Sequence, residues 1–348
     1  MIVKNEQETL NRCLNSCYTL FDEIVIVDTG SQDNTKEIAK KFTDKVLDFK
    51  WCNDFSKARN FAILNTSCEY FMWLDADDVI TDANLKKLKS LKENINNEDF
   101  FMLKYDISFD KNDIPTFSYF RERICKRNDK NLFHDPVHEA IQTYGNIKYL
   151  DISIQHRKVK ANEKERNLKI YEDLIKQKVK FTDRQQFYYS RELFYNNKIN
   201  KAIVNFKKFL KSSTGFVENK IEACENLSRC YLIKNDYLKA KQILFNSFIY
   251  DLPRAEILCS LGYIYEAEGN YNKAIYYFKL ALKAEINLNS GAFVRVDYYN
   301  YIPYLELCVC YFKLGDINKA EYYNNLALKL KPNEEIPNKN KDILNSLK

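Results

Sequence analysis

The 348-residue sequence is poor in glycine and histidine, with seven and three residues respectively, and it has no long apolar run. Its longest uninterrupted apolar stretches are about six residues, whereas a transmembrane helix needs roughly 20. The first residues, M-I-V-K-N-E, lack the basic and then apolar pattern of a secretory signal peptide. The sequence therefore predicts a cytoplasmic protein without a membrane span.

The cysteine spacing does not indicate a zinc-binding protein, and the charge distribution does not indicate a nucleic-acid-binding protein. Ten cysteines are present, but none forms the C-x-x-C pairs that are typical of zinc sites, so reduced core thiols are the simplest interpretation. The net charge is +6, yet lysines and acids are interspersed, and no basic and aromatic binding motif is present. We expect no nucleic-acid partner.

The first 160 residues alternate strand-like and helix-like segments. Apolar, β-branched or aromatic runs occupy residues 24–27, 46–49, 71–74 and 100–105, and amphipathic segments lie between them. This alternation predicts an α/β domain with a mostly parallel sheet that is covered by helices. Ligands of such sheets bind beyond the carboxyl ends of the strands, which is where Asp28 and Asp75 lie.

The second half is helical and repetitive. From residue 261 the chain reads L-G-Y-I-Y-E-A-E-G-N-Y-N-K-A-I-Y-Y-F-K-L-A, which matches the tetratricopeptide pattern. The marker alanines of four copies stand at positions 202, 240, 274 and 320, so insertions interrupt the 34-residue period twice. Helical hairpins of no repeat family are the alternative. We predict an all-α repeat domain over residues 183–348, with a linking helix in 161–182.

An apolar strand ends in three carboxylates in the segment Y-F-M-W-L-D-A-D-D, residues 70–78. Asp75 and Asp77 would point the same way in an extended chain, because side chains alternate across a strand. The pair is suited to a hard cation such as Mg²⁺ or Mn²⁺. The alternative is a solvated turn in which Asp78 or Asp82 caps the next helix.

Several segments, taken in order, resemble the family 2 glycosyltransferases of the GT-A fold, which use nucleotide sugars. They read M-I-V-K-N-E (1–6), D-E-I-V-I-V-D-T-G-S-Q-D-N-T (22–35), W-C-N-D-F-S-K-A-R-N (51–60), W-L-D-A-D-D (73–78), F-H-D-P-V-H-E (133–139) and I-Q-H (154–156). The pattern is most similar to bacterial lipopolysaccharide-core β-1,4-glucosyltransferases and to peptide S-glycosyltransferases, which also carry a helical repeat domain. The resemblance implies a Rossmann-like GT-A domain over residues 1–160, a UDP-sugar donor, and Mn²⁺ or Mg²⁺ as cofactor.

The resemblance also assigns the residues that bind the nucleotide sugar. They are Ile2, Val3, Glu6 and Asp28 at the uridine, Arg59 at the base or diphosphate, and Asp75, Ala76 and His138 nearer the ribose and sugar. Simpler alternatives exist for three of them. Asp28 suits a turn, Glu6 a helix N-terminus, and Arg59 a salt bridge on a helix surface.

The metal ligands implied by the resemblance are Asp75, Asp77 and His156, although H-R-K-V follows here where the family often has H-x-G-Y. Inverting transfer needs a base that takes the proton of the acceptor. The resemblance places a carboxylate near V-H-E, so Glu139 is the predicted base and Asp135 the alternative. Glu139 has a structural interpretation as well, in which it begins a helix and complements the helix dipole.

The resemblance implies a metal-dependent, inverting glycosyltransferase that moves a sugar from a UDP-sugar to a protein or peptide side chain. A cell-surface glycan or a lipid-linked acceptor is the alternative. The repeat domain would form a homodimer or present the polypeptide acceptor. A catalytically inactive repeat scaffold is the rival from another class, and a nucleotidyltransferase would need a glycine-rich phosphate loop near the first strand, which this sequence lacks.

Overall fold

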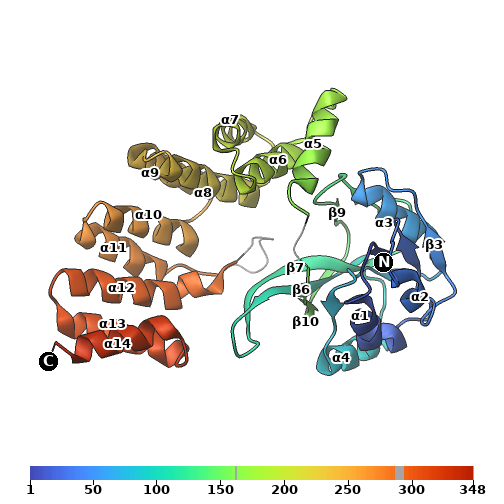
Figure 1. Ribbon diagram of the computed structural model, residues 1–348, viewed down its shortest axis with the longest axis horizontal. Coiled ribbons are helices and arrows are strands. Elements are labelled where there is room, and N and C mark those ends of the chain that lie inside the picture. The colour runs from blue at the N-terminus through green and yellow to red at the C-terminus, as the bar shows by residue number, and fades with distance from the viewer. Residues whose placement is uncertain (161–162, 287–293, 348) are drawn as a thin grey trace. The chain divides into compact units, whose positions relative to one another are not determined.

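The computed structural model describes residues 1–160, 163–286 and 294–347 (Figure 1). The chain divides into two compact units, Met1–Val179 and Lys180–Lys348. The helix of the predicted linking segment, α5 (Arg166–Lys176), belongs to the first unit. Among the described residues, no helix has the length and apolar character that a membrane crossing requires.

The first unit begins with a three-stranded parallel sheet. Its strands run in the order β1, β2, β3, and Val3 lies opposite Asp28 in the register of β1 with β2. The elements of this part are β1 (Ile2–Val3), α1 (Leu10–Cys17), η1 (Tyr18–Leu20), β2 (Ile26–Asp28), α2 (Thr35–Ala39), β3 (Val46–Asp48) and α3 (Phe55–Leu64). Helix α3 begins at a side-chain cap, because Asp54 accepts a hydrogen bond from the backbone N–H of Lys57 at 3.0 Å.

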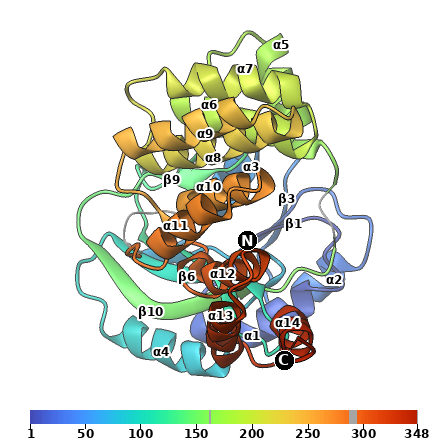
Figure 2. The same ribbon diagram turned by 90° about the vertical axis from the view of Figure 1, so that its left-hand side faces the viewer.

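A second sheet has five strands in the order β4, β7, β6, β10, β5, and helix α4 packs along β10 (Figure 2). The bounds are β4 (Tyr70–Met72), β5 (Asp78–Val79), α4 (Asp82–Glu93), β6 (Phe100–Phe109), β7 (Pro115–Lys126), β8 (Phe133–His134), β9 (Ala140–Ile141) and β10 (Ile147–His156). Only β6 and β10 pair in parallel in this sheet. The α/β class is confirmed. The first sheet is parallel as expected, whereas this second sheet is mixed, because β6 returns into β7 through a short hairpin.

A turn follows β4 and carries Asp75, Asp77 and Asp78. The backbone N–H of Asp78 donates to the carbonyl of Asp75 at 3.1 Å, so residues 75–78 are not extended. Strand β5 then pairs with the end of β10, with His156 opposite Asp78. Thr81 caps α4 by accepting from the N–H of Asn84, so neither aspartate of the alternative interpretation caps this helix.

The second unit consists of stacked helices (Figure 1). They are α6 (Asp183–Tyr195), α7 (Ile199–Leu210), α8 (Val217–Ile233), α9 (Tyr237–Asn246), η2 (Ser247–Ile249), α10 (Ala255–Ala267), α11 (Tyr271–Ala281), η4 (Val296–Tyr299), α12 (Tyr301–Lys313), α13 (Ile317–Leu330) and α14 (Glu335–Asn345). All four marker alanines are fully buried. A Cβ atom at Gly262 would lie only 2.6 Å from the Phe278 ring, which explains why this helix crossing needs a glycine.

Two carboxylates give the repeat unit a predicted pH dependence. Burial and the nearby charge of Glu266 raise the pKa of Glu306 to about 7. The folded chain therefore keeps a proton that the unfolded chain releases between about pH 4.5 and 7, so the free energy of unfolding falls as pH rises across that window. We expect Glu306→Gln to stabilise the unit by roughly 2–3 kcal/mol at pH 8 and to flatten this dependence. Urea unfolding at pH 5 and pH 8 measures both effects.

The matched control is Glu335→Gln, which removes an exposed carboxylate from α14 in the same unit. We expect this substitution to change the free energy of unfolding by less than about 0.5 kcal/mol at either pH. Equal pH profiles for Glu306→Gln and the unsubstituted chain would show that Glu306 does not hold the proton.

Candidate metal and nucleotide-sugar site

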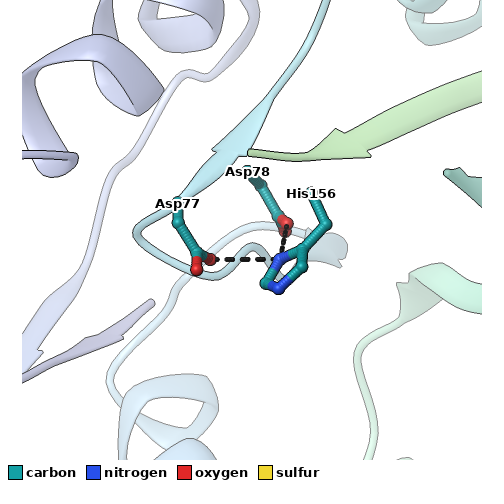
Figure 3. A group of neighbouring side chains, drawn as sticks. All are labelled: Asp77, Asp78 and His156. Atoms are coloured by element: carbon teal, nitrogen blue, oxygen red, sulfur yellow. Dashed lines mark ion pairs between the residues drawn. The ribbon is translucent and has the colours of Figure 1, made fainter. Parts of the chain in front are cut away.

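Asp77, Asp78 and His156 come together where β5 meets the end of β10 (Figure 3). The Nδ1 atom of His156 lies 3.3 Å from Oδ1 of Asp77 and 3.7 Å from Oδ1 of Asp78. One candidate ligand atom from each residue lies within 4.8 Å of the others. Two carboxylates and an imidazole form a donor set that fits Mn²⁺ or Mg²⁺, so the chemistry of these side chains suits the predicted cofactor.

Asp78 is held by buried neighbours on the long strands. Its Oδ1 accepts from the Tyr105 hydroxyl at 2.8 Å, and its Oδ2 accepts from Nη1 of Arg123 at 3.0 Å. The guanidinium of Arg123 is fully buried between two aromatic rings, at 3.8 Å from Trp73 and 4.0 Å from Tyr105. These ring faces compensate for Nε and Nη2 of Arg123, which have no hydrogen-bond partner among the described residues.

The surroundings of His156 favour its protonated, positively charged form. Burial lowers its pKa, but hydrogen bonds to Asp77 and Asp78 and the charges of these two carboxylates outweigh burial and raise the pKa to about 9. The Tyr105 hydroxyl lies 2.8 Å from Nδ1. The imidazole is therefore a cation among carboxylates, in a place where a divalent ion would replace its proton.

The predicted ligand Asp75 lies outside this group and pairs with Arg59. Nη2 of Arg59 donates to Oδ1 of Asp75 at 2.6 Å, and Nε donates to Oε1 of Glu139 at 2.7 Å. Burial raises the pKa of Asp75, but the charges of Arg59 and Arg123 outweigh it and hold the pKa well below its usual range. Arg59 thus connects two carboxylates from segments that are far apart in the sequence.

Glu139 lies in the loop between β8 and β9, directly before β9, so it does not begin a helix. Asp135 and His138 in the same loop have left-handed backbones, with φ angles of 72° and 56°. Strained backbone of this kind is held only where the surroundings fix it, and it is common at functional sites. One such contact is the N–H of Phe55, which donates to the carbonyl of Pro136 at 2.8 Å.

Asp28 ends β2 and is 1% exposed. Its Oδ1 accepts from the N–H groups of Gly30 and Ser31, both at 2.9 Å, so it forms the predicted turn. Gly30 has a φ angle of 107°, which only glycine adopts readily. Oδ2 of Asp28 is buried without a hydrogen-bond partner among the described residues. The turn and a free acceptor therefore coexist, and a buried acceptor of this kind is costly unless a ligand satisfies it.

The remaining predicted residues surround this turn. Ile2 is half-buried and Val3 buried in β1, and Ala76 packs with Val3 in one apolar cluster. Glu6 accepts from the Thr9 hydroxyl at 2.9 Å at the start of α1. Burial raises the pKa of Glu6, Thr9 lowers it, and the charge of Asp77 raises it further. Glu6 is therefore electrostatically coupled to Asp77, and through it to the metal candidate group of Asp77, Asp78 and His156.

A cavity of about 400 Å³ lies within this unit, but it is lined mainly by apolar residues such as Ile2, Val25, Ala62, Phe71 and Leu74. None of the metal candidate residues lines it. An apolar wall does not suit a charged diphosphate, so the candidate site is the polar group described above.

Asp78, Tyr105 and Arg123 are not among the site residues that the sequence predicts. The sequence suggests Asp78 only as an alternative helix cap. A signal for Arg123 exists in the segment F-R-E-R-I-C, residues 120–125, where three charged residues interrupt an otherwise apolar strand. Charged side chains in a buried strand need partners, and here the partners of Arg121 and Arg123 are Glu122 and Asp78.

Comparison with known proteins decides the family of the first unit. Residues 1–149 match the model for glycosyl transferase family 2. This part of the chain is a family 2 glycosyltransferase domain. Residues 255–285 match a tetratricopeptide repeat, which confirms the predicted repeats in the second unit.

The chain has bacterial and phage relatives. Glycosyltransferase SunS from Bacillus subtilis (strain 168) is 27% identical over 253 residues, which cover 68% of this chain and 59% of SunS. A poly-β-1,6-N-acetyl-D-glucosamine synthase from Staphylococcus epidermidis is 38% identical over 98 residues, covering 26% of this chain and 24% of the synthase. The chain thus spans about three-fifths of SunS and a quarter of the synthase. Among solved structures, the type IV pilus biogenesis factor PilW aligns with 50% of this chain and 74% of its own, at 17% identity and a TM-score of 0.42.

The buried ion pair beneath the site leads to a stability prediction. Arg123→Met removes the buried guanidinium that donates to Oδ2 of the fully buried Asp78, so this carboxylate loses its closest positive charge. We expect a loss of about 3–5 kcal/mol in the free energy of unfolding. The control is Lys126→Met on the same strand, whose pair with Glu69 is exposed and whose loss should cost under about 1 kcal/mol. Similar losses for the two variants in urea unfolding would contradict this.

Proposed function

We propose that the chain is a metal-dependent, inverting glycosyltransferase that moves a sugar from a UDP-sugar to a protein or peptide side chain. The family 2 domain supports glycosyl transfer. The observation that carries the proposal is the convergence of Asp77, Asp78 and His156 within 4.8 Å, in the unit that also holds Arg59 and the acceptor oxygen of Asp28.

The donor would be held at two places in this proposal. The unpartnered Oδ2 of Asp28 accepts the imide N–H of uracil, which favours uridine over bases without that donor. Asp77, Asp78 and His156 hold the divalent cation, which would stabilise the negative charge that develops on the departing UDP. Arg59 adds a fixed positive charge from within the protein, where such charges act strongly.

Glu139 is the proposed base. It would take the proton of the acceptor while the acceptor attacks the anomeric carbon from the side opposite the departing UDP, which inverts the configuration. Because Arg59 contacts both Glu139 and Asp75, it fixes the position of the base relative to the turn that carries the metal ligands. Asp135 remains the alternative base on the same loop.

The repeat unit supports a polypeptide acceptor, because tetratricopeptide repeats bury their faces against each other and leave extended surfaces for protein partners. The likeness to a poly-β-1,6-N-acetyl-D-glucosamine synthase favours the second candidate, transfer to a glycan. A homodimer through the repeat unit stays a prediction.

A panel of UDP-sugars, scored for hydrolysis with Mn²⁺ and with a chelator, tests the proposal. We expect one or a few UDP-sugars to be hydrolysed, with activity lost on chelation and restored by adding Mn²⁺. Parallel assays with CDP- and ADP-sugars should show little turnover if Asp28 selects uracil, because cytosine and adenine lack the ring N–H that Asp28 would accept from. A flat panel in every nucleotide series would show that the site is not a transferase centre and would favour the scaffold hypothesis.

A further inference from the structure

The segment between α11 and α12 contacts helices that are distant in the sequence. It belongs to the insertion that widens the spacing between Ala274 and Ala320 to 46 residues. Residues 294–299 are described, and the 3₁₀ helix η4 within them packs against both α10 and α12. Val294 is 4% exposed, and Arg295 has an extended backbone, with φ of −99° and ψ of 90°.

Two buried carboxylates hold Arg295. Its Nη2 donates to Oε2 of Glu225 in α8 at 2.5 Å, and its backbone N–H donates to Oε1 of Glu256 in α10 at 2.9 Å. The guanidinium also lies 4.7 Å from the ring of Tyr298. The two carboxylates thus contact the side chain and the main chain of one extended residue.

These contacts exceed what packing of a connecting segment requires. Glu225 and Glu256 are 5% and 6% exposed, and burying carboxylates is costly unless they are paired. Glu225 uses its other oxygen to accept from Arg229 at 2.8 Å. Oε2 of Glu256 is buried and accepts no hydrogen bond within the described part of the chain. Apolar side chains in this connecting segment would pack on α8 and α10 without this cost.

The arrangement has the features of peptide recognition. An extended residue presents its amide N–H to one fixed acceptor and its guanidinium to another, and the aromatic ring of Tyr298 beside the charge belongs to the same segment. We propose that Glu225 and Glu256 form a binding site for an arginine in an extended peptide, and that residues 294–299 occupy this site in the free chain. The site shares no residue with the group Asp77, Asp78 and His156.

The covalently linked segment competes with any external peptide. Because this competition is intramolecular, an external arginine peptide binds weakly until the internal arginine is removed. The probe is the fluorescently labelled hexapeptide V-R-V-D-Y-Y, which has the sequence of residues 294–299. Fluorescence anisotropy with the full chain measures its affinity.

We expect Arg295→Ala and Arg295→Met each to bind the probe at least tenfold more tightly than the unsubstituted chain. The methionine variant keeps most of the side-chain length and so preserves the packing on Tyr298. Adding Glu225→Gln to Arg295→Met should abolish the gain. Adding Glu222→Gln should not, because this glutamate lies on the same helix and pairs with Arg191 instead.

The second comparison changes the arginine of the probe peptide. Replacing its arginine by alanine should abolish binding, and replacing it by lysine should weaken binding, because an ammonium lacks the planar fork of the guanidinium. Equal affinity of the unsubstituted chain and both Arg295 variants would overturn the proposal. So would a gain that is insensitive to Glu225→Gln or to loss of the probe's arginine. UDP-sugar hydrolysis should be unchanged in the Arg295 variants, so failure here is distinguishable from failure of the proposed activity.

Discussion

Asp77→Asn is expected to reduce metal-dependent turnover of the UDP-sugar by about 10³-fold or more, in the range seen when a principal electrostatic group is lost. Both oxygens of Asp78 already accept hydrogen bonds from Tyr105 and Arg123, and these neighbours balance its charge. Asp77 instead pairs with His156, whose proton a cation would replace, so its carboxylate is the one most available to a metal ion. Asparagine keeps the size and one oxygen but removes that charge.

The measurement is turnover as a function of Mn²⁺ concentration, with Asp82→Asn as the matched control. Asp82 is an exposed aspartate only a few residues along the same segment, in the first turn of α4. We expect its substitution to change turnover less than about twofold, because exposed charges outside the site contribute little. Turnover in Asp77→Asn that equals the control at every Mn²⁺ concentration would remove Asp77 from the site.

Glu139→Gln is expected to keep binding of UDP and to lose transfer by about 10²–10⁴-fold, the usual contribution of a positioned general base. Glutamine retains an oxygen that can accept from Nε of Arg59, so the contact at 2.7 Å survives and Arg59 stays in place. What is lost is only the ability to take a proton. Titration of UDP, followed by transfer assays on the same preparation, separates binding from proton abstraction.

Asp135→Asn is the companion variant, because Asp135 lies in the same loop and is the alternative base. We expect it to retain most of the transfer activity. The opposite result, retained transfer in Glu139→Gln together with loss in Asp135→Asn, would move the role of base to Asp135. Loss in both would indicate that the loop as a whole positions the acceptor.

Local sequence patterns predicted much of the architecture, because the determining interactions are local. The tetratricopeptide spacing placed the buried alanines at 202, 240, 274 and 320, all of which are fully buried. The turn after β2 followed from Asp28 and Gly30, since an aspartate that bonds the next N–H groups and a glycine with positive φ suffice to form it.

The composition of the metal candidate group was not predictable in the same way. Side-chain alternation along a strand suggested Asp75 and Asp77 as partners, but residues 75–78 form a turn, so alternation does not apply there. Asp78 joins His156 only through the register of β5 with β10, between residues 78 positions apart. Arg123 reaches Asp78 from a hairpin strand 45 residues away, and no local pattern specifies such a pairing.

Binding of Mn²⁺, followed by electron paramagnetic resonance with and without UDP, tests most directly whether Asp77, Asp78 and His156 hold a catalytic cation. We predict one bound ion per chain, an affinity that UDP increases at least tenfold, and loss of this binding in Asp77→Asn. Binding that is the same in Asp77→Asn and in the unsubstituted chain, or that does not respond to UDP, would contradict the assignment.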